Sequence, residues 1–307
     1  MEYLIEKYKD IRVYWTTDLD GGGRSFGQQF IPMVAQLIGP VRRLYEFCAG
    51  PGFIGFSLLA NGFCDTLCLS DINPKAVEAA KKTVEENDLA DRVSVYLSDG
   101  LSGILASERW DLVVGNPPHF CVGSEDEHNA DIIQFDSNWR IHKMFYQQVH
   151  RFLLPHSSVL LIENYCGSDE SVFKPLIMSG NLDFVESLMY CSPEPILNSH
   201  YFIWSRMKAN NIVVGHMAPR TVRVLVSEMD SGFLEVKLEP FEKVQVEIVN
   251  DLDKAARIGL QMCSPEPEQR IYLPPRSTKT SGIILSSGVP LYLTHHLQRD
   301  SLVCSLC

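Results

Sequence analysis

Short apolar segments alternate with longer amphipathic segments between residues 44 and 208. Apolar runs such as 66–71 and 111–116 have the length of buried strands, and 73–89 carries apolar side chains at helical spacing. Repeated strand–helix units with apolar strands build a mostly parallel sheet that helices cover on both faces. The pattern predicts, in order, strand 44–48, helix 52–62, strand 66–71, helix 73–89, strands 92–99 and 111–116, helix 138–154, strand 157–165 and helix 169–180.

The residues that follow have a different pattern. Two apolar segments, 181–190 and 201–207, have no helix between them and predict an antiparallel hairpin at the edge of a seven-stranded sheet. After about Lys208, apolar and polar residues alternate and Gly, Pro and Ser are frequent, which is typical of short strands. The predicted organisation is an N-terminal lead-in or lid over 1–40, an α/β domain over 41–208 and a small β-rich domain over 209–307.

Composition limits the environment and the partners of the chain. Of its 307 residues, 38 are Asp or Glu and 27 are Lys or Arg, which gives a net charge of −11. Because a protein that grips phosphate backbones usually presents a basic face, this balance disfavours a nucleic-acid partner without excluding one. The nine cysteines do not resemble a disulfide framework, and no apolar run is long enough to span a bilayer, so we expect a cytoplasmic protein with no membrane partner. Cys304 and Cys307 supply only two of the four ligands of a structural zinc site, and no metal is predicted.

A glycine-rich turn follows the first strand of the predicted sheet. Gly50, Gly52 and Gly55 satisfy the spacing GxGxxG, and Asp71 stands at the end of the next strand. Glycines in such a turn let the backbone approach a ligand closely, and a carboxylate about twenty residues further on can accept hydrogen bonds from ribose hydroxyls. These residues alone fit a dinucleotide as well as another cofactor.

Further polar residues at the same sheet edge narrow the choice of cofactor. Glu46 stands at the exit of the first strand, Asp99 and Gly100 end the third strand, and Asn116-Pro117-Pro118 ends the fourth. In this joint order the chain resembles the class I S-adenosylmethionine-dependent methyltransferases over about residues 20–208. The resemblance implies a Rossmann-like α/β fold and S-adenosyl-L-methionine as the cofactor.

The resemblance also implies roles for individual residues. The glycine loop would pack against the amino-acid part of the cofactor, and Glu46 would help to hold its methionine end. Asp71 would bind the ribose hydroxyls, with Ile72 beside the adenine and Asp99 at the adenine amino group. Such enzymes often have a lead-in segment that closes over the methionine portion. The implied cofactor-binding residues are Phe26 and Gln28 in the lead-in, and Glu46, Gly50, Pro51, Gly52, Asp71, Ile72, Asp99, Gly100 and Asn116 along the sheet edge.

The segment Asn116-Pro117-Pro118 carries the expected catalysis. In the enzymes that it resembles, this motif is followed by Tyr, Phe or Trp and serves methyl transfer to a nitrogen of low basicity. The Asn116 side-chain oxygen and the Pro117 carbonyl would accept hydrogen bonds from the protons of that nitrogen and help to localise its lone pair beside the sulfonium methyl. His119 occupies the fourth position here, where an imidazole can stack on a planar group or act as a base. This departure also admits an aliphatic amine as the acceptor.

Residues beyond this motif are candidates for binding the methyl acceptor. Asp131, Asp136 and Trp139 lie where a substrate lid is expected, and acidic and aromatic groups together suit a cationic substrate. Asn138 belongs to the same segment, or it caps the following helix. Residues 163–165 end the fifth strand at the edge where ligands bind in open α/β sheets. The predicted substrate contacts are Asn138, Trp139 and Tyr165.

The leading functional hypothesis is an N-methyltransferase that acts on a small molecule such as an amino acid or a guanidine. An alternative is N-methylation of RNA, DNA or protein, with the β-rich domain as the recognition module. A second alternative uses the same cofactor without methyl transfer, closing its amino-acid part to azetidine-2-carboxylate and releasing methylthioadenosine. A catalytically silent scaffold is a third. A dinucleotide oxidoreductase is disfavoured by Glu46 and by the Asn-Pro-Pro segment.

Overall fold

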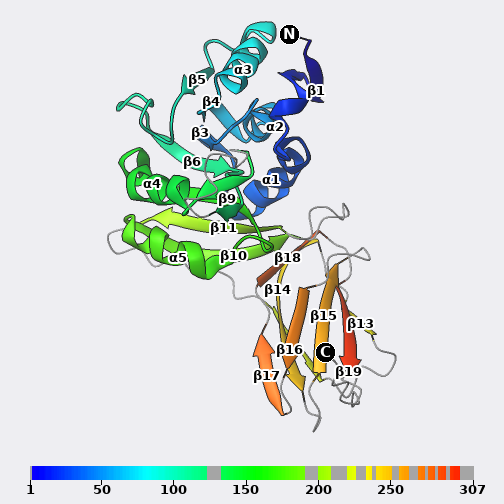
Figure 1. Ribbon diagram of the computed structural model, residues 1–307. Coiled ribbons are helices and arrows are strands. Elements are labelled where there is room, and N and C mark those ends of the chain that lie inside the picture. Colours follow the sequence, from blue (N-terminus) through cyan, green and yellow to red (C-terminus); the bar gives the residue numbers. More distant parts are fainter. Residues whose placement is uncertain are drawn as a thin grey trace, which may run out of the picture. The chain divides into compact units, whose positions relative to one another are not determined.

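Figure 1 shows the computed structural model, which describes residues 2–122, 133–190 and 200–208 and separate strands beyond them. The described C-terminal segments are 220–225, 233–236, 240–250, 256–262, 269–273, 276–280, 283–287 and 291–297. The chain divides into two units. One contains residues 1–186 and 201–213, and the other contains residues 187–200 and 214–307.

The apolar segments of the N-terminal part form the predicted sheet. Its seven strands lie in the order β5-β4-β3-β6-β9-β11-β10, and the pairs β5–β4, β4–β3, β3–β6 and β6–β9 are parallel. β10 and β11, the last two of these seven strands along the chain, are neighbours, as the sequence predicts. The predicted edge position is wrong, because β10 pairs with a further strand, β18 (Ile283–Ser287). The Rossmann-like α/β fold with a mostly parallel sheet is therefore confirmed. The strands are β3 (Val41–Phe47), β4 (Cys64–Asp71), β5 (Val93–Leu97), β6 (Trp110–Gly115), β9 (Leu153–Asn164), β10 (Leu182–Tyr190) and β11 (His200–Met207).

Helices cover both faces of this sheet (Figure 1). Helices α1 to α3 lie on one face, and α4 and α5 lie on the other. Residues of α2 are buried almost throughout because the helix lies between the sheet and α1, whereas α3 is amphipathic and begins with a cap in which Asn73 accepts a hydrogen bond from the Lys75 N–H. The helices are α1 (Gly23–Leu37), α2 (Phe53–Ala60), α3 (Pro74–Glu86), α4 (Arg140–Gln148) and α5 (Glu170–Ser179), and the 3₁₀ turn η2 (Val149–Arg151) follows α4.

The N-terminal lead-in contains structure that the sequence analysis does not anticipate. Residues Leu4–Tyr8 (β1) and Ile11–Trp15 (β2) form an antiparallel hairpin. The hairpin is tied to α3, because the Tyr14 N–H donates to the Thr83 hydroxyl at 2.9 Å. After the 3₁₀ turn η1 (Thr17–Leu19), helix α1 begins at Gly23.

Two short strands lie between β6 and α4 along the chain. Phe120–Val122 (β7) pairs in parallel with Phe135–Ser137 (β8).

The described residues of the second unit form strands. β14 pairs in parallel with β12 and antiparallel with β17 and β18, and a four-stranded sheet has the order β13-β19-β15-β16. The expected β-rich character is confirmed for the described residues of this unit. The strands are β12 (Arg220–Leu225), β13 (Phe233–Val236), β14 (Pro240–Asn250), β15 (Ala256–Met262), β16 (Gln269–Leu273), β17 (Ser277–Thr280), β18 (Ile283–Ser287) and β19 (Leu291–Leu297).

Within the described ranges, no helix has both the length and the apolar character needed to cross a bilayer.

Candidate active site

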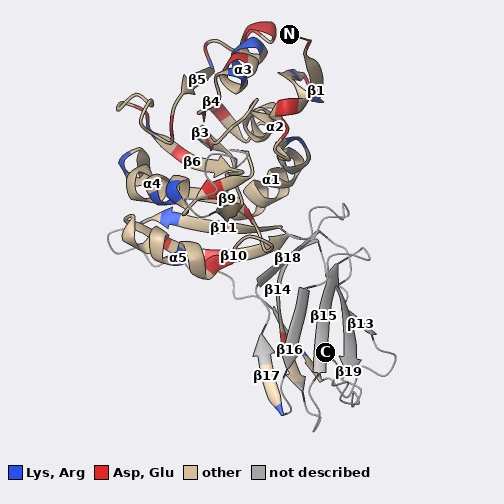
Figure 2. Cartoon of the chain, in the orientation of Figure 1, with Lys and Arg blue, Asp and Glu red and all other residues tan. Residues whose placement is uncertain are grey.

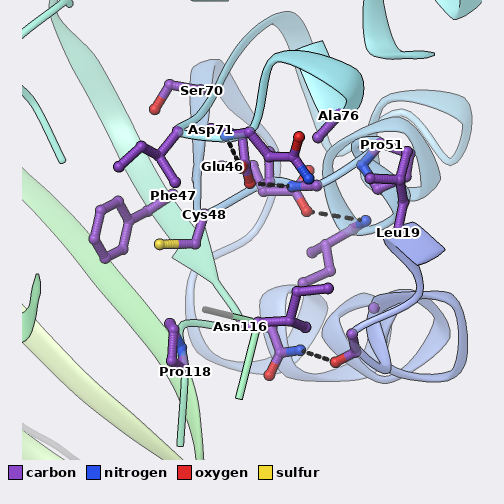
Figure 3. Close-up of a pocket in the computed structure, with 18 of the residues that line it drawn as sticks. Leu19, Glu46, Phe47, Cys48, Pro51, Ser70, Asp71, Ala76, Asn116 and Pro118 are labelled. Atoms are coloured by element: carbon purple, nitrogen blue, oxygen red, sulfur yellow. Dashed lines mark hydrogen bonds between the residues drawn. The ribbon is translucent and has the colours of Figure 1, made fainter. Parts of the chain in front are cut away.

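A pocket lies at the carboxyl ends of β3, β4, β5 and β6, the edge at which the sequence analysis places the site (Figure 3). It encloses about 910 Å³, including open solvent at its mouth. The N-terminal lead-in contributes to its wall through Leu19, Gly21 and Gly23. Eight of the predicted cofactor-binding residues line it, namely Glu46, Gly50, Pro51, Asp71, Ile72, Asp99, Gly100 and Asn116.

Glu46 lies in the pocket wall with its carboxylate turned towards the start of α2. Its two oxygens accept hydrogen bonds from the N–H groups of Ile54 at 3.3 Å and Gly55 at 2.7 Å. The side chain is buried, and burial raises the pKa of Glu46 to about 8, although the two N–H groups act in the opposite direction. Glu46 therefore fixes the glycine turn to the sheet and brings a readily neutralised carboxyl to the pocket.

The glycine turn is held in shape by Asp71. One carboxylate oxygen of Asp71 accepts from the Gly50 N–H at 2.7 Å and the other from the Asn73 N–H at 2.8 Å (Figure 3). Gly52, which is not among the lining residues described, has a φ of +89°, and a Cβ on it would lie 2.8 Å from Phe56. Gly52 is thus required by the backbone conformation and by the packing of α2.

The opposite end of the pocket carries an ion pair that the sequence analysis does not anticipate. Asp99 faces Arg140 on α4, with Nη1 and Oδ2 3.3 Å apart and both side chains 47% exposed. Ile72 and Gly100 lie in the same part of the wall, and Ile72 is an exposed large apolar side chain. An apolar side chain beside a charged and partly exposed carboxylate gives this end the character of a site for a planar polar ring.

Asn116 joins the fourth strand to the N-terminal lead-in. Its side-chain Nδ2 donates a hydrogen bond of 3.0 Å to the backbone carbonyl of Gly21 (Figure 3). Its Oδ1 is buried and has no hydrogen-bond partner among the described residues. Because the donor end of the amide is engaged by a carbonyl, the free acceptor is the oxygen, at the position predicted to receive the protons of a reacting nitrogen. Pro118 also lines the pocket, and Pro117 is buried.

His119 is the end of a chain of buried ionisable groups. Its Nδ1 lies 3.5 Å from Glu163 Oε2, and Glu163 Oε1 lies 3.0 Å from His142 Nε2. His142 Nδ1 in turn lies 2.6 Å from Asp136 Oδ2. Asp136, His142 and Glu163 are fully buried, and the His119 side chain is 11% exposed.

The charges of this cluster follow from its geometry. Since both ring nitrogens of His142 face carboxylate oxygens, both must donate, which requires the imidazolium form. Burial disfavours that form, but the two carboxylates outweigh it and raise the pKa of His142 to about 9. Burial would likewise raise the pKa of Glu163, whereas the two neighbouring imidazoles lower it below its usual value. Within the described ranges, no group of three or more side chains has the arrangement of a metal site.

The predicted substrate residues are not among the pocket-lining residues described. Trp139 packs edge-on against His142 and Phe173, with ring centroids 5.3 Å and 5.0 Å apart. Tyr165 stacks on Tyr201 at 4.3 Å. Asn138 is exposed, and its backbone carbonyl accepts from the Lys143 side chain. Their proposed contact with an acceptor stays a prediction.

Two expectations about the segment before α4 are wrong. Asn138 does not cap the helix, because the N-cap position is Trp139 and makes no side-chain cap. Asp136 satisfies the first N–H groups of α4 instead, accepting from Ile141 at 2.9 Å and from His142 at 3.1 Å. A carboxylate at a helix N-terminus is also stabilised by the helix dipole. Asp136 is therefore a buried anchor and not part of an open lid.

Several residues singled out from the sequence lie away from the pocket wall or outside the described part of the chain. Phe26 and Gln28 belong to α1 and are absent from the described pocket wall, and the Phe26 side chain lies outside the described residues. Asp131, Cys304 and Cys307 also lie outside them. The residues that the sequence analysis missed include Arg140 and His142. Their only signal is their place on the α4 segment after the Asn-Pro-Pro turn, which does not indicate their partners.

Comparison with known proteins identifies relatives of the N-terminal part. Residues 9–135 match the family described as methyltransferase small domain. A bifunctional methyltransferase of Rickettsia bellii is 24% identical over 136 residues, which make up 41% of this chain and 24% of that protein. A ribosomal RNA small subunit methyltransferase C of Hahella chejuensis is 30% identical over 123 residues, 40% of this chain and 31% of that protein. The chain thus spans less than a third of the length of these curated relatives.

A solved structure gives a weaker likeness. The T. thermophilus 16S rRNA N2 G1207 methyltransferase, in complex with AdoMet and guanosine, superposes with a TM-score of 0.46 and 13% sequence identity. The superposition covers 67% of this chain and 50% of that chain. The family resemblance predicted from the order of motifs is confirmed by the match over residues 9–135.

Proposed function

We propose, on the premise of the match between residues 9–135 and the methyltransferase small domain family, that the chain is an N-methyltransferase whose acceptor is a small molecule with a nucleophilic nitrogen, such as an amino acid or a guanidine. S-adenosyl-L-methionine is its proposed cofactor. The single observation that carries the N-methyl assignment is the Oδ1 of Asn116 after β6, which is buried and has no hydrogen-bond partner among the described residues.

The residues of the pocket fit the proposed cofactor. Asp71 keeps lone pairs on both oxygens beyond the two N–H groups that it accepts, so it can also receive two ribose hydroxyls. The turn at Gly50 leaves backbone within reach of a ligand, since a Cβ there would meet no atom closer than Leu19 O at 3.7 Å. Glu46 lines the pocket and would help to hold the methionine end of the cofactor. When bound, the cofactor supplies an electrophilic methyl group on a positively charged sulfur.

Asn116 would orient the acceptor nitrogen. Its Oδ1 accepts one proton of that nitrogen while the bond from Nδ2 to Gly21 keeps the amide from rotating. The Pro117 carbonyl would accept a second proton, and the two prolines limit the backbone freedom of the turn. Fixing the nitrogen in this way aligns its lone pair and reduces the entropy lost on reaching the transition state.

His119 would receive the proton that the acceptor nitrogen loses. It stands where the resembled family has an aromatic residue, and an imidazole adds a titratable group to the stacking surface. An aliphatic amine must lose a proton before it attacks, which makes a base useful at this position. Glu163, 3.5 Å from Nδ1, would favour the charged imidazolium once the proton has arrived.

A small-molecule acceptor is supported by charge. The chain carries a net charge of −11, and in Figure 2 the basic residues of the described chain lie in short separate segments such as those on α3 and α4. The second candidate acceptor is RNA. It is favoured by the Hahella chejuensis relative, whose name states ribosomal RNA as its substrate.

The test is to identify the product made from S-adenosylmethionine. The purified chain is incubated with the cofactor alone, with pooled amino acids and guanidines, and with total RNA. S-adenosylhomocysteine that forms only with the small-molecule pool supports the proposal, and formation only with RNA would replace it by the second candidate. Methylthioadenosine without any acceptor would indicate intramolecular cyclisation, and absence of cofactor binding would leave a silent scaffold.

A further inference from the structure

The buried groups behind His119 come from three different elements of the chain. Glu163 is near the end of β9, His142 is on α4, and Asp136 is on β8. Glu163 joins them to the residue after the Asn-Pro-Pro turn, because its Oε2 lies 3.5 Å from His119 Nδ1. Neither these three residues nor His119 is among the described residues that line the pocket, whereas Asn116 and Pro118 of the turn are, so the cluster and His119 lie behind this wall.

Such a cluster is costly to bury. It contains two carboxylates and one imidazolium, so it carries a net negative charge before His119 is counted. Taking charged groups out of water is unfavourable unless they are paired and hydrogen-bonded, and replacing such a cluster by apolar side chains is often neutral or stabilising. Asp136 accepts three hydrogen bonds of 3.1 Å or less, from the Ile141 N–H, the His142 N–H and the His142 ring, so one end of the cluster is firmly fixed. The remaining negative charge faces His119.

We propose that Glu163 is a positioning residue for His119, and that His142 and Asp136 hold Glu163 in place for this purpose. The proposal rests on the proposed function and deepens it. Glu163 turns Nδ1 of the His119 ring towards itself, which leaves Nε2 on the opposite side as the proton acceptor. Glu163 also stabilises the imidazolium that results, while the pair of His142 and Asp136 prevents the carboxylate from swinging away.

The step balances with these groups alone and the proposed cofactor. The lone pair of the acceptor nitrogen forms the new bond to the methyl carbon, and the electron pair of the breaking carbon–sulfur bond stays on sulfur. The proton released from the nitrogen passes to Nε2 of His119. The His119 imidazolium then lies against the Glu163 carboxylate, so the cluster becomes neutral overall at the moment that the proton arrives.

The backbone around His119 is arranged to keep this contact. A turn at the end of β9, in which Asn164 accepts hydrogen bonds from the Cys166, Gly167 and Ser168 N–H groups, brings Gly167 against the His119 carbonyl. A Cβ on Gly167 would overlap that carbonyl oxygen, at 2.1 Å. β9 and the turn that follows it therefore lie against both the ring and the backbone of His119.

The experiment compares Glu163→Gln with a matched control, Glu108→Gln, in the full chain. Glu108 is also a buried carboxylate and is paired with Arg43 at 2.7 Å. It lies just before β6, at the amino end of that strand, whereas the site residues lie at the carboxyl ends of the strands. For each protein we would measure S-adenosylmethionine affinity by calorimetry, methyl transfer to the amine pool, and ring-nitrogen NMR signals of ¹⁵N-histidine-labelled protein. Histidine signals are assigned with His119→Asn and His142→Asn.

For Glu163→Gln we expect turnover to fall about 100-fold, the scale of a positioned acid or base, with cofactor affinity within about twofold of the parent and altered His119 ring signals. Glu108→Gln should change neither turnover nor those signals. Unchanged His119 signals in Glu163→Gln, or an equal loss of turnover in the control, would overturn the proposal. If Glu163→Gln does not fold, Glu163→Asp and Asp136→Asn provide the same comparison. Absence of methyl transfer in the parent would refute the proposed function, whereas the NMR arm would still test the link between Glu163 and His119.

Discussion

The side-chain amide of Asn116 donates its hydrogen bond to the backbone carbonyl of Gly21 at 3.0 Å, across 95 residues of sequence. The contact joins the end of β6 to the segment just before α1, and it fixes which end of the amide is free. The unpaired buried Oδ1 that results is the feature on which the N-methyl assignment depends.

Replacing Asn116 by Ala should mainly lower turnover. The change removes the acceptor of the nitrogen's protons but leaves Glu46 and Asp71 in place, so we expect a loss of about 100-fold in kcat, equivalent to roughly 3 kcal/mol in the transition state. Cofactor affinity, measured by calorimetry, should change only a few-fold. A loss of affinity as large as the loss of turnover would argue against a role in orienting the acceptor.

Replacing Asp71 by Ala should act on the cofactor instead. The substitution removes the acceptor of two backbone N–H groups that shape the glycine turn, together with the proposed ribose contacts. Hydrogen bonds to charged groups contribute about 1.5–3 kcal/mol, so we expect the dissociation constant of S-adenosylmethionine to rise at least tenfold. Asp65→Ala, on the surface at the opposite end of β4, is the control and should leave the affinity unchanged.

How much of this site the sequence predicts depends on the kind of contact. Asp71, Asp99 and Asn116 are found because apolar strands and their polar ends have a local pattern, and parallel strands bring their carboxyl ends to one edge. The hairpin β1–β2 and the partners of His142 are not found. Both depend on contacts between distant residues, such as His142 with Glu163, and no local periodicity encodes them. The interpretation of Asp136 as part of a substrate lid is wrong for the same reason. An acidic residue near an aromatic one is typical of a ligand site, and the sequence does not show the buried partners of Asp136.

The stability of the protein should fall as the pH rises from about 6.5 to about 9. The pKa of His142 is raised from 6.5 to about 9 in the folded protein. A raised folded-state pKa means that the contribution is complete below the unfolded value and is lost as the pH passes through the folded value. Since one pKa unit corresponds to about 1.4 kcal/mol, up to roughly 3 kcal/mol is involved. The pKa of Glu46 is raised from 4.5 to about 8, so its contribution to stability is also lost as the pH rises, over this lower range.

Thermal unfolding of His142→Asn checks this assignment. The variant should be less stable than the parent at pH 6 and should lose less stability between pH 6 and pH 9. His156→Asn is the control, because His156 is exposed and its positive φ suits Asn. An equally steep pH dependence in His142→Asn and in the parent would contradict the charged state assigned to the buried imidazole.

Substituting Gly167 by Ala should displace the Asn-Pro-Pro-His turn. The new methyl group would overlap the His119 carbonyl, and the strain should cost roughly 1–3 kcal/mol of stability. We expect turnover to fall while cofactor affinity is retained, because Gly167 is not among the described lining residues of the pocket. The adjacent exposed Cys166, changed to Ala, should have neither effect, and parent-like turnover in Gly167→Ala would indicate that the turn tolerates movement.

The most direct test of the central claim follows the methyl group itself. The chain is incubated with S-adenosylmethionine labelled in the methyl group and with the pooled amines, and the products are analysed by mass spectrometry. The account predicts that the label appears on a nitrogen of an added small molecule, in equal amount to S-adenosylhomocysteine, and that Asn116→Ala nearly abolishes both. Recovery of the label in methylthioadenosine, with no labelled acceptor, would contradict it.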